Sequence, residues 1–490
     1  MLTIGEIAAL THGYGTHAYG AHGAHGEATV HEAAALRVTG VSTDSRAIAQ
    51  DDLFVALVGE HFDGHDYLAD VAARGAAAAL VSRVHDSCAL PCVRVRDTRR
   101  ALGDLALGWR WRFDLPVIAV TGSNGKTTTK EMIAAILAEE FGETDRLATR
   151  GNLNNDIGVP QTLLRLRTHH RAAVVELGMN HPGETARLAE IAAPTVALIV
   201  NAQREHQEFM ESVAAVAAEH RLAIAALAGN GIAVFPADDA HAASWREAAG
   251  ARRVVDFAAL TDHDADAMGA TVVARVHLDA ESSIIPLDTP LGATTVRLAV
   301  AGLHNARNAA AAAAAAVAAD VSIAAIHRGL EAFVPVAGRS QRFETPRGAR
   351  VIDDSYNANP DSVRAAIDVL AAQPSPRVLI LGDMGEVGVA GARFHAEVGD
   401  YAREQRIDAL FATGAASRET VAAFGVEARH FDDVEALAAA ARALFDDAAL
   451  PTFLVKGSRF MRMERVVAAL CETAGETAGS SAGPSNQGGH

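Results

Sequence analysis

The stretch Val117-Ile-Ala-Val-Thr-Gly-Ser-Asn-Gly-Lys-Thr-Thr-Thr129 decides the fold of this chain. Its first residues form a short β-branched run that predicts a buried strand, and its glycines predict a turn into a helix over 127–141. Gly122 and Gly125 let backbone N–H groups approach phosphate oxygens, and a helix N-terminus adds partial positive charge. We therefore predict a phosphate-binding loop, with Lys126 on the β- and γ-phosphates and Thr127 offering its hydroxyl to Mg²⁺.

This loop departs from the standard phosphate-loop spacing, because two residues rather than four separate its glycines. The alternative is an ordinary glycine-rich turn between a strand and a helix. Lysine usage favours the phosphate loop, since Lys126, Lys130 and Lys456 are the only lysines in the sequence and the other cations are arginines. A compact ammonium fits a phosphate cradle better than a branched guanidinium does.

Composition limits the class of protein. A chain of 490 residues with 50% hydrophobic and 21% charged residues predicts a globular protein of about three domains. Its net charge of −17 argues against a nucleic-acid partner. Three cysteines exclude a disulfide scaffold. The N-terminus has no signal-peptide pattern and the alanine run at 309–319 is too short for a bilayer, so we expect a cytoplasmic monomer without a membrane partner.

The hydrophobic pattern divides the chain into blocks at 1–112, 113–335 and 336–470, followed by a Gly/Ser/Ala-rich tail at 471–490 that we expect to be disordered. In the first block, runs at 52–59 and 77–82 predict strands with a helix near 67–74. Its Gly/His-rich stretch at 12–31 favours a mobile loop, with metal binding as the weaker alternative.

Strands alternate with helices in the other two blocks. In the second block, strands are predicted at 117–120, 173–176 and 196–201, antiparallel strands within 262–300, and an alanine-rich helix after Asn308. Strands of the third block are predicted at 351–353, 378–381, 410–413 and 453–455. The fold class is therefore α/β with three domains, the central one built on a phosphate-loop-type, mostly parallel sheet and the C-terminal one Rossmann-like.

Polar residues follow several of these strands. Glu176 ends a predicted strand, and a carboxylate there would face the same crevice as the phosphate loop and suit Mg²⁺. His206 follows the next strand, and Asn308 precedes the alanine helix, where it is either a cap or a ligand-binding residue. In the third block, Asp353–Pro360, Gly382–Glu386 and Lys456–Arg459 follow three strands, which predicts a ligand-facing crevice rather than three ordinary loops.

Together these motifs resemble the Mur ligase family of ATP-dependent amide-bond-forming enzymes. The similar stretches run in order along nearly the whole chain: TGSNGKTTTKEM (121–132), GNLNNDIGVPQTLL (151–164), VVELGMNHPGE (174–184), GLHNARN (302–308), DDSYNANP (353–360), GDMGEVG (382–388) and VKGSR (455–459). Within the family, the third-block motifs resemble the branch that adds D-alanyl-D-alanine to a UDP-N-acetylmuramoyl-tripeptide in peptidoglycan synthesis. The alternatives are a sister ligase that adds one amino acid, a nucleotide-hydrolysing switch, and an inactive homologue that only binds.

The resemblance also implies cofactors and roles for individual residues, with ATP and Mg²⁺ as cofactors. The implied catalytic residues are Lys126 and His206, to which we add Glu219 by hypothesis. The implied metal ligands are Thr127, Glu176 and His206. The implied ATP contacts are Thr121, Gly122, Ser123, Asn124, Gly125, Lys126, Thr127, Thr128, Asn308, Arg339 and Asp353. The implied substrate contacts are Asp44, Ser45, Arg46, Phe62, His65, Asn154, Asn155, Asn357, Asn359, Lys456 and Ser458.

One departure from the family concerns a carbamoylated lysine that supplies a carboxylate to a second metal in many members, about one helix beyond the position of His206. This chain has no lysine between Lys130 and Lys456. Arginine is a permanent cation and cannot replace the group. We hypothesise that the carboxylate of Glu219, or that of Glu208 or Glu211, takes its place; the alternative is that water completes the metal shell.

Overall fold

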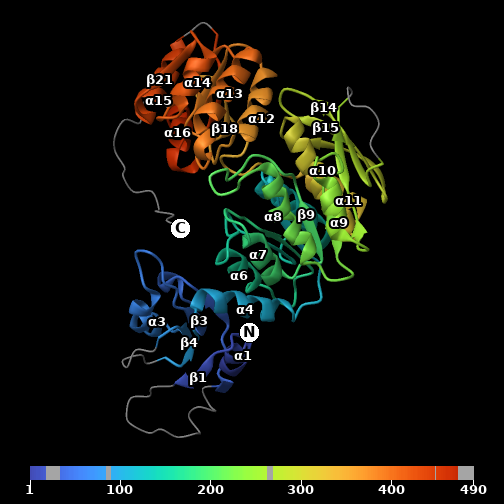
Figure 1. The fold of residues 1–490 in the computed structure, drawn as a ribbon, viewed down its shortest axis with the longest axis vertical. Coiled ribbons are helices and arrows are strands. Elements are labelled where there is room, and N and C mark those ends of the chain that lie inside the picture. The colour runs from blue at the N-terminus through green and yellow to red at the C-terminus, as the bar shows by residue number, and fades with distance from the viewer. Residues whose placement is uncertain (18–33, 84–89, 262–268, 447–448, 473–490) are drawn as a thin grey trace. The chain divides into compact units, whose positions relative to one another are not determined.

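The computed structural model of the chain describes residues 1–17, 34–83, 90–261, 269–446 and 449–472 (Figure 1). Residues 473–490 of the predicted disordered tail and most of the Gly/His-rich stretch lie outside these residues, whereas Cys471, the first residue of that predicted tail, is the last residue of a helix. The chain forms two units. The first holds residues 1–277, 283–299 and 303–333, and the second holds residues 278–282, 300–302 and those from 334 on. None of the helices within the described ranges is both long and apolar enough to cross a membrane.

The first sheet of unit 1 has the strand order β1-β5-β4-β3-β2. Its strands β2–β5 are parallel, and β1 pairs antiparallel with β5. The predicted strands and helix of the first block are confirmed. The strand predicted at 52–59 ends at Val55, because the Leu57 N–H donates to the Val55 carbonyl and so forms a turn. The elements are α1 (Ile4–Leu10), β1 (Tyr14–His17), β2 (Gly40–Ser42), η1 (Ser45–Ala47), β3 (Asp52–Val55), η2 (Gly64–Tyr67), α3 (Leu68–Ala73), β4 (Ala78–Val81), β5 (Cys92–Arg94) and α4 (Thr98–Arg110).

Helix α4 joins this sheet to the next one. Asp97 caps its N-terminus by accepting the N–H groups of Arg99 and Arg100. One hydrophobic cluster runs from Leu53 in the first sheet through Leu105 in α4 to Val117 in the central sheet. Figure 1 shows α4 between the first sheet and helices α6 and α7. The first two predicted blocks therefore share a core.

The central sheet of unit 1 has the order β11-β10-β9-β6-β8-β7, and all its pairs are parallel, as predicted. Strand β6 (Val117–Thr121) is buried along its whole length and lies between β8 (Ala172–Glu176) and β9 (Val196–Ile199). The other elements are α5 (Lys126–Phe141), β7 (Arg146–Ala148), α6 (Gly158–Leu163), α7 (Glu184–Ala192), α8 (Val213–Ala225), β10 (Ile232–Val234), α9 (Ala242–Ala249) and β11 (Arg253–Val254).

A smaller sheet follows along the chain, and all of its strand residues except Leu278 belong to unit 1. It has the order β12-β13-β15-β14, with β16 paired to β15. The predicted antiparallel pairing is confirmed for β13–β15 and β15–β16, whereas β12 and β13 are parallel. Its strands are β12 (Phe257–Leu260), β13 (Val272–Arg275), β14 (His277–Leu278), β15 (Ser283–Thr289) and β16 (Gly292–Leu298).

The alanine-rich helix α10 (Leu303–Ala318) begins before Asn308, not after it as predicted. Asn308 is thus inside the helix and cannot be its N-terminal cap. Residues 309–316 are fully buried, because alanine lets a helix approach its neighbours closely. Helix α11 (Ile323–Glu331) follows and packs with α10 against α5.

Unit 2 contains the predicted Rossmann-like sheet, with the order β17-β18-β22-β19-β20-β21. All its pairs are parallel except β17–β18 at one edge. The four predicted strands correspond to β18, β19, β20 and β22. The elements are β17 (Gln341–Glu344), β18 (Arg350–Asp354), α12 (Pro360–Ala371), β19 (Arg377–Leu381), η3 (Gly388–Ala390), α13 (Gly391–Glu404), β20 (Ala409–Thr413), α14 (Ser417–Phe424), β21 (Ala428–Phe431), α15 (Val434–Ala443), η4 (Leu444–Asp446), β22 (Thr452–Lys456), η5 (Arg459–Met461) and α16 (Glu464–Cys471).

At Gly329, helix α11 lies close against the phosphate-loop helix α5. A Cβ there would lie 2.4 Å from the Cα of Ile136 and 2.6 Å from its N. We expect Gly329→Ala to push the helices apart and lower the free energy of unfolding by about 1–3 kcal/mol. Denaturant unfolding measures the change. Gly229→Ala is the control, since no atom lies within 4 Å of a Cβ at that position; equal stability of the two variants would contradict the packing argument.

Candidate nucleotide-binding site

The glycine loop lies at the carboxyl end of β6, where the chain turns into α5. Gly122 has φ 135° and Gly125 has φ 82°, conformations that L side chains rarely adopt. A Cβ on Gly122 would lie 3.0 Å from the Val200 backbone nitrogen, and one on Gly125 would lie 2.2 Å from Oδ1 of Asn308. Glycine is therefore required at both positions, and Asn308 lies directly against the loop.

The segment after β9 holds the loop in shape. The Asn124 N–H donates to Oδ1 of Asn201 at 2.9 Å, and Nδ2 of Asn201 donates back to the Asn124 carbonyl. Oγ of Ser123 accepts the N–H of Gln203 at 2.8 Å, and Nδ2 of Asn124 donates to Oε1 of Gln203. Sequence reasoning missed Asn201 and Gln203, although both follow a strand that neighbours β6.

Lys126 is the first residue of α5, and its ammonium has three oxygen acceptors. Its Nζ donates to the carbonyls of Gly122 at 2.5 Å and Ser123 at 3.1 Å, and to Oε2 of Glu205 at 3.1 Å. An ammonium carries three N–H donors, so all of its donors are used. Its side chain is 15% exposed, which leaves it accessible to a ligand at the loop.

Glu205 is a buried carboxylate that sequence reasoning did not select. Burial by itself would raise its pKa, but the attraction of Lys126 and the hydrogen bond from His220 outweigh burial and lower the pKa to about 2. His220 Nε2 lies 3.1 Å from Oε1 of Glu205, and His220 Nδ1 lies 3.0 Å from Oγ1 of Thr121. The site therefore holds a fixed negative charge next to the ammonium.

Glu176 ends β8 on the other side of β6. Its Oε1 accepts the hydroxyl of Thr127 at 3.1 Å and Nδ2 of Asn154 at 2.8 Å, while the Glu176 N–H donates to Oγ1 of Thr149. Its Oε2 is buried without a hydrogen-bond partner. Carboxylate and hydroxyl oxygens are ligands that a hard cation prefers, so Glu176 and Thr127 fit Mg²⁺.

No group of three or more His, Cys, Asp or Glu side chains in the described part of the chain is arranged to hold a metal ion. A cation at Glu176 would therefore need further oxygens, such as those of a phosphate. His206 has a left-handed backbone, with φ 48°, and its Nε2 lies 3.8 Å from Oε2 of Glu205. Backbone strain of this kind gathers at functional sites.

Glu219, the hypothesised substitute for the carbamate, has a different environment. Its two oxygens accept the N–H groups of Gly183 at 2.9 Å and Thr185 at 2.8 Å, at the N-terminus of α7. The other two candidates, Glu208 and Glu211, are exposed. The carboxylate that contacts Lys126 is that of Glu205.

The sequence-predicted residues of the third block gather at the carboxyl ends of β18 and β22. Lys456 is buried and donates to Oδ2 of Asp354 at 2.5 Å and to the Asn357 carbonyl at 2.8 Å. Burial raises the pKa of Asp353, whose Oδ1 accepts the N–H of Ser355. The polar side chains at these two strand ends thus partly meet one another's hydrogen-bonding needs, through the ion pair of Lys456 and Asp354.

Three further residues of this block are held locally. Ser458 donates to the Ala358 carbonyl and accepts the N–H of Gly385. Asn359 caps α12. The guanidinium of Arg339 lies over the ring of Tyr356, 4.2 Å from its centroid.

In the first sheet, Asp44 caps the short helix η1 that begins at Ser45. Asp44 forms a two-point ion pair with Arg46, whose hydrogen bond lowers the pKa of that carboxyl. Both side chains are accessible to solvent. Phe62 is 53% exposed, which is unusual for an aromatic ring of this size.

His65, in contrast, is buried and saturated. Its Nε2 accepts the Ser82 N–H at 3.0 Å, so Nδ1 carries the proton that bonds Oδ1 of Asp63 at 2.6 Å. The exposed Asn155 accepts the N–H groups of Ile157 and Gly158 at the start of α6. The side chains of these two residues therefore hold the backbone at Ser82 and at the start of α6.

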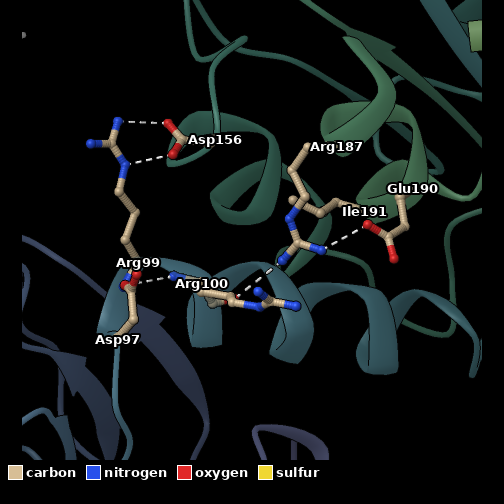
Figure 2. A pocket seen from close by; sticks show the side chains of 7 residues that line it. All are labelled: Asp97, Arg99, Arg100, Asp156, Arg187, Glu190 and Ile191. Atoms are coloured by element: carbon tan, nitrogen blue, oxygen red, sulfur yellow. Dashed lines mark hydrogen bonds and ion pairs between the residues drawn. The ribbon is translucent and has the colours of Figure 1, made fainter. Parts of the chain in front are cut away.

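A separate pocket lies between α4, the loop before α6, and α7 (Figure 2). Figure 2 shows two ion pairs in it, Arg99 with Asp156 and Arg187 with Glu190, whose N–O distances are 2.5 Å and 2.9 Å. None of the sequence-predicted site residues lines it.

A central parallel strand, a glycine turn, a lysine at a helix N-terminus and a neighbouring carboxylate define an α/β protein with a phosphate-binding loop. Residues 37–110 match the Mur ligase family catalytic domain, residues 120–316 the Mur ligase middle domain, and residues 338–459 the Mur ligase glutamate ligase domain. The chain belongs to the Mur ligase family.

Relatives and solved structures are similar along almost the whole chain. The UDP-N-acetylmuramoyl-tripeptide–D-alanyl-D-alanine ligase of Escherichia coli is 41% identical, over 90% of this chain and 95% of its own length. The ligase of the same name from Haemophilus influenzae is 36% identical, over 89% and 94%. The structure of MurF from Acinetobacter baumannii superposes with a TM-score of 0.86 at 35% identity, over 96% and 99%. That of MurF ligase from Thermotoga maritima in complex with ADP gives 0.76 at 25% identity, over 88% and 96%.

Glu176→Gln tests the fit to Mg²⁺. The amide replaces one carboxylate oxygen by a donor and removes the charge, so we expect the affinity for ADP with Mg²⁺ to fall by about tenfold or more. Affinity for ADP without Mg²⁺ should not fall, because the lost carboxylate charge repels the phosphates. Calorimetric titration with and without the metal measures both, with the exposed Glu143→Gln as control. Unchanged Mg²⁺ dependence would remove Glu176 from the metal site.

Proposed function

We propose that this chain joins D-alanyl-D-alanine to the terminal carboxylate of UDP-N-acetylmuramoyl-tripeptide, with ATP cleaved to ADP and phosphate. The observation that carries the proposal is the 41% identity to the Escherichia coli ligase of that name, which spans 95% of that enzyme's length. The phosphate loop with Lys126 supports it independently, because this chemistry requires transfer of a terminal phosphoryl group.

The reaction begins when the tripeptide carboxylate attacks the γ-phosphate of ATP and ADP leaves. The amine of D-alanyl-D-alanine then attacks the acyl phosphate, and the tetrahedral intermediate expels phosphate and loses a proton to give the amide. Charge spreads over the phosphoryl oxygens during transfer. Lys126, the loop amides and the N-terminus of α5 neutralise it.

Mg²⁺ is part of the proposal. Thr127 and Glu176 would hold it, and His206 lies on the Glu205 side of the same loop. A bound Mg²⁺ would neutralise phosphate charge during transfer. The unpartnered Oε2 of Glu176 supports this assignment, since a buried carboxylate oxygen otherwise loses its hydration without compensation.

The substrate contacts belong to the same proposal. The exposed Asp44–Arg46 pair and the exposed Phe62 ring suit the uridine nucleotide, which offers polar groups and an aromatic face. Among the substrate contacts in unit 2, Lys456 brings positive charge to the polar end of β22, where an anionic reactant would be stabilised.

Phosphate release separates this function from its alternatives. With ATP, Mg²⁺ and UDP-linked tripeptide, we expect rapid release only when D-alanyl-D-alanine is present, with both the diaminopimelate and the lysine form of the tripeptide tested. Release that needs a single amino acid instead would identify a sister ligase. Release without any tripeptide would indicate a nucleotide-hydrolysing switch. Either result would contradict the proposal.

A further inference from the structure

Four side chains from separate elements form one hydrogen-bonded chain behind the phosphate loop. Oγ1 of Thr121, at the end of β6, lies 3.0 Å from Nδ1 of His220 in α8. His220 Nε2 lies 3.1 Å from Oε1 of Glu205, and Oε2 of Glu205 lies 3.1 Å from Nζ of Lys126. This series of hydrogen bonds therefore begins at Thr121, before the loop, and ends at Lys126, after it.

The direction of the bond between His220 and Glu205 follows from the groups themselves. An ionised carboxylate only accepts, so Nε2 of His220 donates to Glu205. Nδ1 of His220 faces the hydroxyl of Thr121, which can donate or accept a hydrogen bond. Thr121 is 1% exposed, His220 0% and Glu205 5%, so protein groups rather than water fix the position of the carboxylate. Buried networks whose members are all satisfied are rigid.

Position separates Glu205 from the other acids near the loop. Glu176 lies on the opposite side of β6 and bonds Thr127, whereas Glu219 bonds the first turn of α7. Glu205 alone of these three contacts the Lys126 ammonium. It therefore supplies a fixed carboxylate at the loop in a chain that has no lysine between Lys130 and Lys456.

We propose that Glu205 is a positioning residue for Lys126, held in place by His220 and Thr121, and that this network orients the ammonium for phosphoryl transfer. The inference rests on the proposed function. A lysine side chain has four rotatable bonds, and ordering it in advance removes an entropy cost from the reaction. The carboxylate also opposes the negative charge of the nucleotide, so it helps turnover without helping nucleotide binding.

This division between binding and turnover gives the test. We expect Glu205→Gln, which keeps the shape but removes the charge, to lower kcat for ligation by about tenfold to a hundredfold. The affinity for ADP, measured by calorimetry without Mg²⁺, should be equal to or tighter than that of the wild type. The control is Glu143→Gln, an exposed acid that belongs to none of the candidate sites, which should leave both values unchanged.

Two results would overturn the inference. One is a kcat for Glu205→Gln within twofold of the wild-type value. The other is a parallel loss of kcat, ADP affinity and melting temperature, which would mean that Glu205 only maintains the fold. Failure of the wild-type chain to ligate at all would instead contradict the proposed function, so the two failures are distinguishable.

Two further variants test the network. Glu205→Asp keeps the charge one methylene further away and should recover part of the kcat that Gln loses; equal kcat for Asp and Gln would contradict a role for the charge. His220→Gln should also lower kcat, as Glu205→Gln does. The double variant should lose little more kcat than Glu205→Gln alone, because both substitutions break the same hydrogen-bonded network. Multiplicative effects would show that the two residues act separately and would refute the network.

Discussion

The ammonium of Lys126 is held by three oxygens, two from its own loop and one from Glu205, and the candidate site is arranged around this interaction. It depends on β6 being an inner strand of a parallel sheet. Because β8 and β9 flank β6, their carboxyl ends bring Glu176 to one side of the loop and Glu205 to the other. A slip of either strand by one residue would turn its side chains to the opposite face.

The rarity of lysine proved informative, since all three ammonium groups are in buried or nearly buried polar settings. Lys130 is 0% exposed and donates to the Thr149 carbonyl at 2.9 Å, while the Thr149 hydroxyl receives the Glu176 N–H. Lys456 bonds a carboxylate and a carbonyl at the end of β22. A planar guanidinium presents its donors in a fixed fork and does not fit such compact sets of acceptors.

Sequence reasoning found the features that local pattern determines. The β-branched run before Gly122 and the strand ending at Glu176 are continuous in the chain, so the loop and the parallel sheet could be predicted. The Glu205–His220 pair could not, because it joins residues 15 positions apart through tertiary packing. The alanine run predicts a helix that starts after Asn308 and so suggests Asn308 as its cap, but the helix begins at Leu303, because the residues before the alanines are helical as well.

Replacement of Lys126 by alanine tests the central claim most directly. The variant should melt below the wild type, because it leaves the buried Glu205 carboxylate without its ammonium partner, so circular dichroism must first show that it is folded at assay temperature. Its rate of joining D-alanyl-D-alanine to UDP-linked tripeptide should fall by about a hundredfold or more, since a donor aimed at developing charge is lost. Joining at the wild-type rate by folded Lys126→Ala protein would contradict the account.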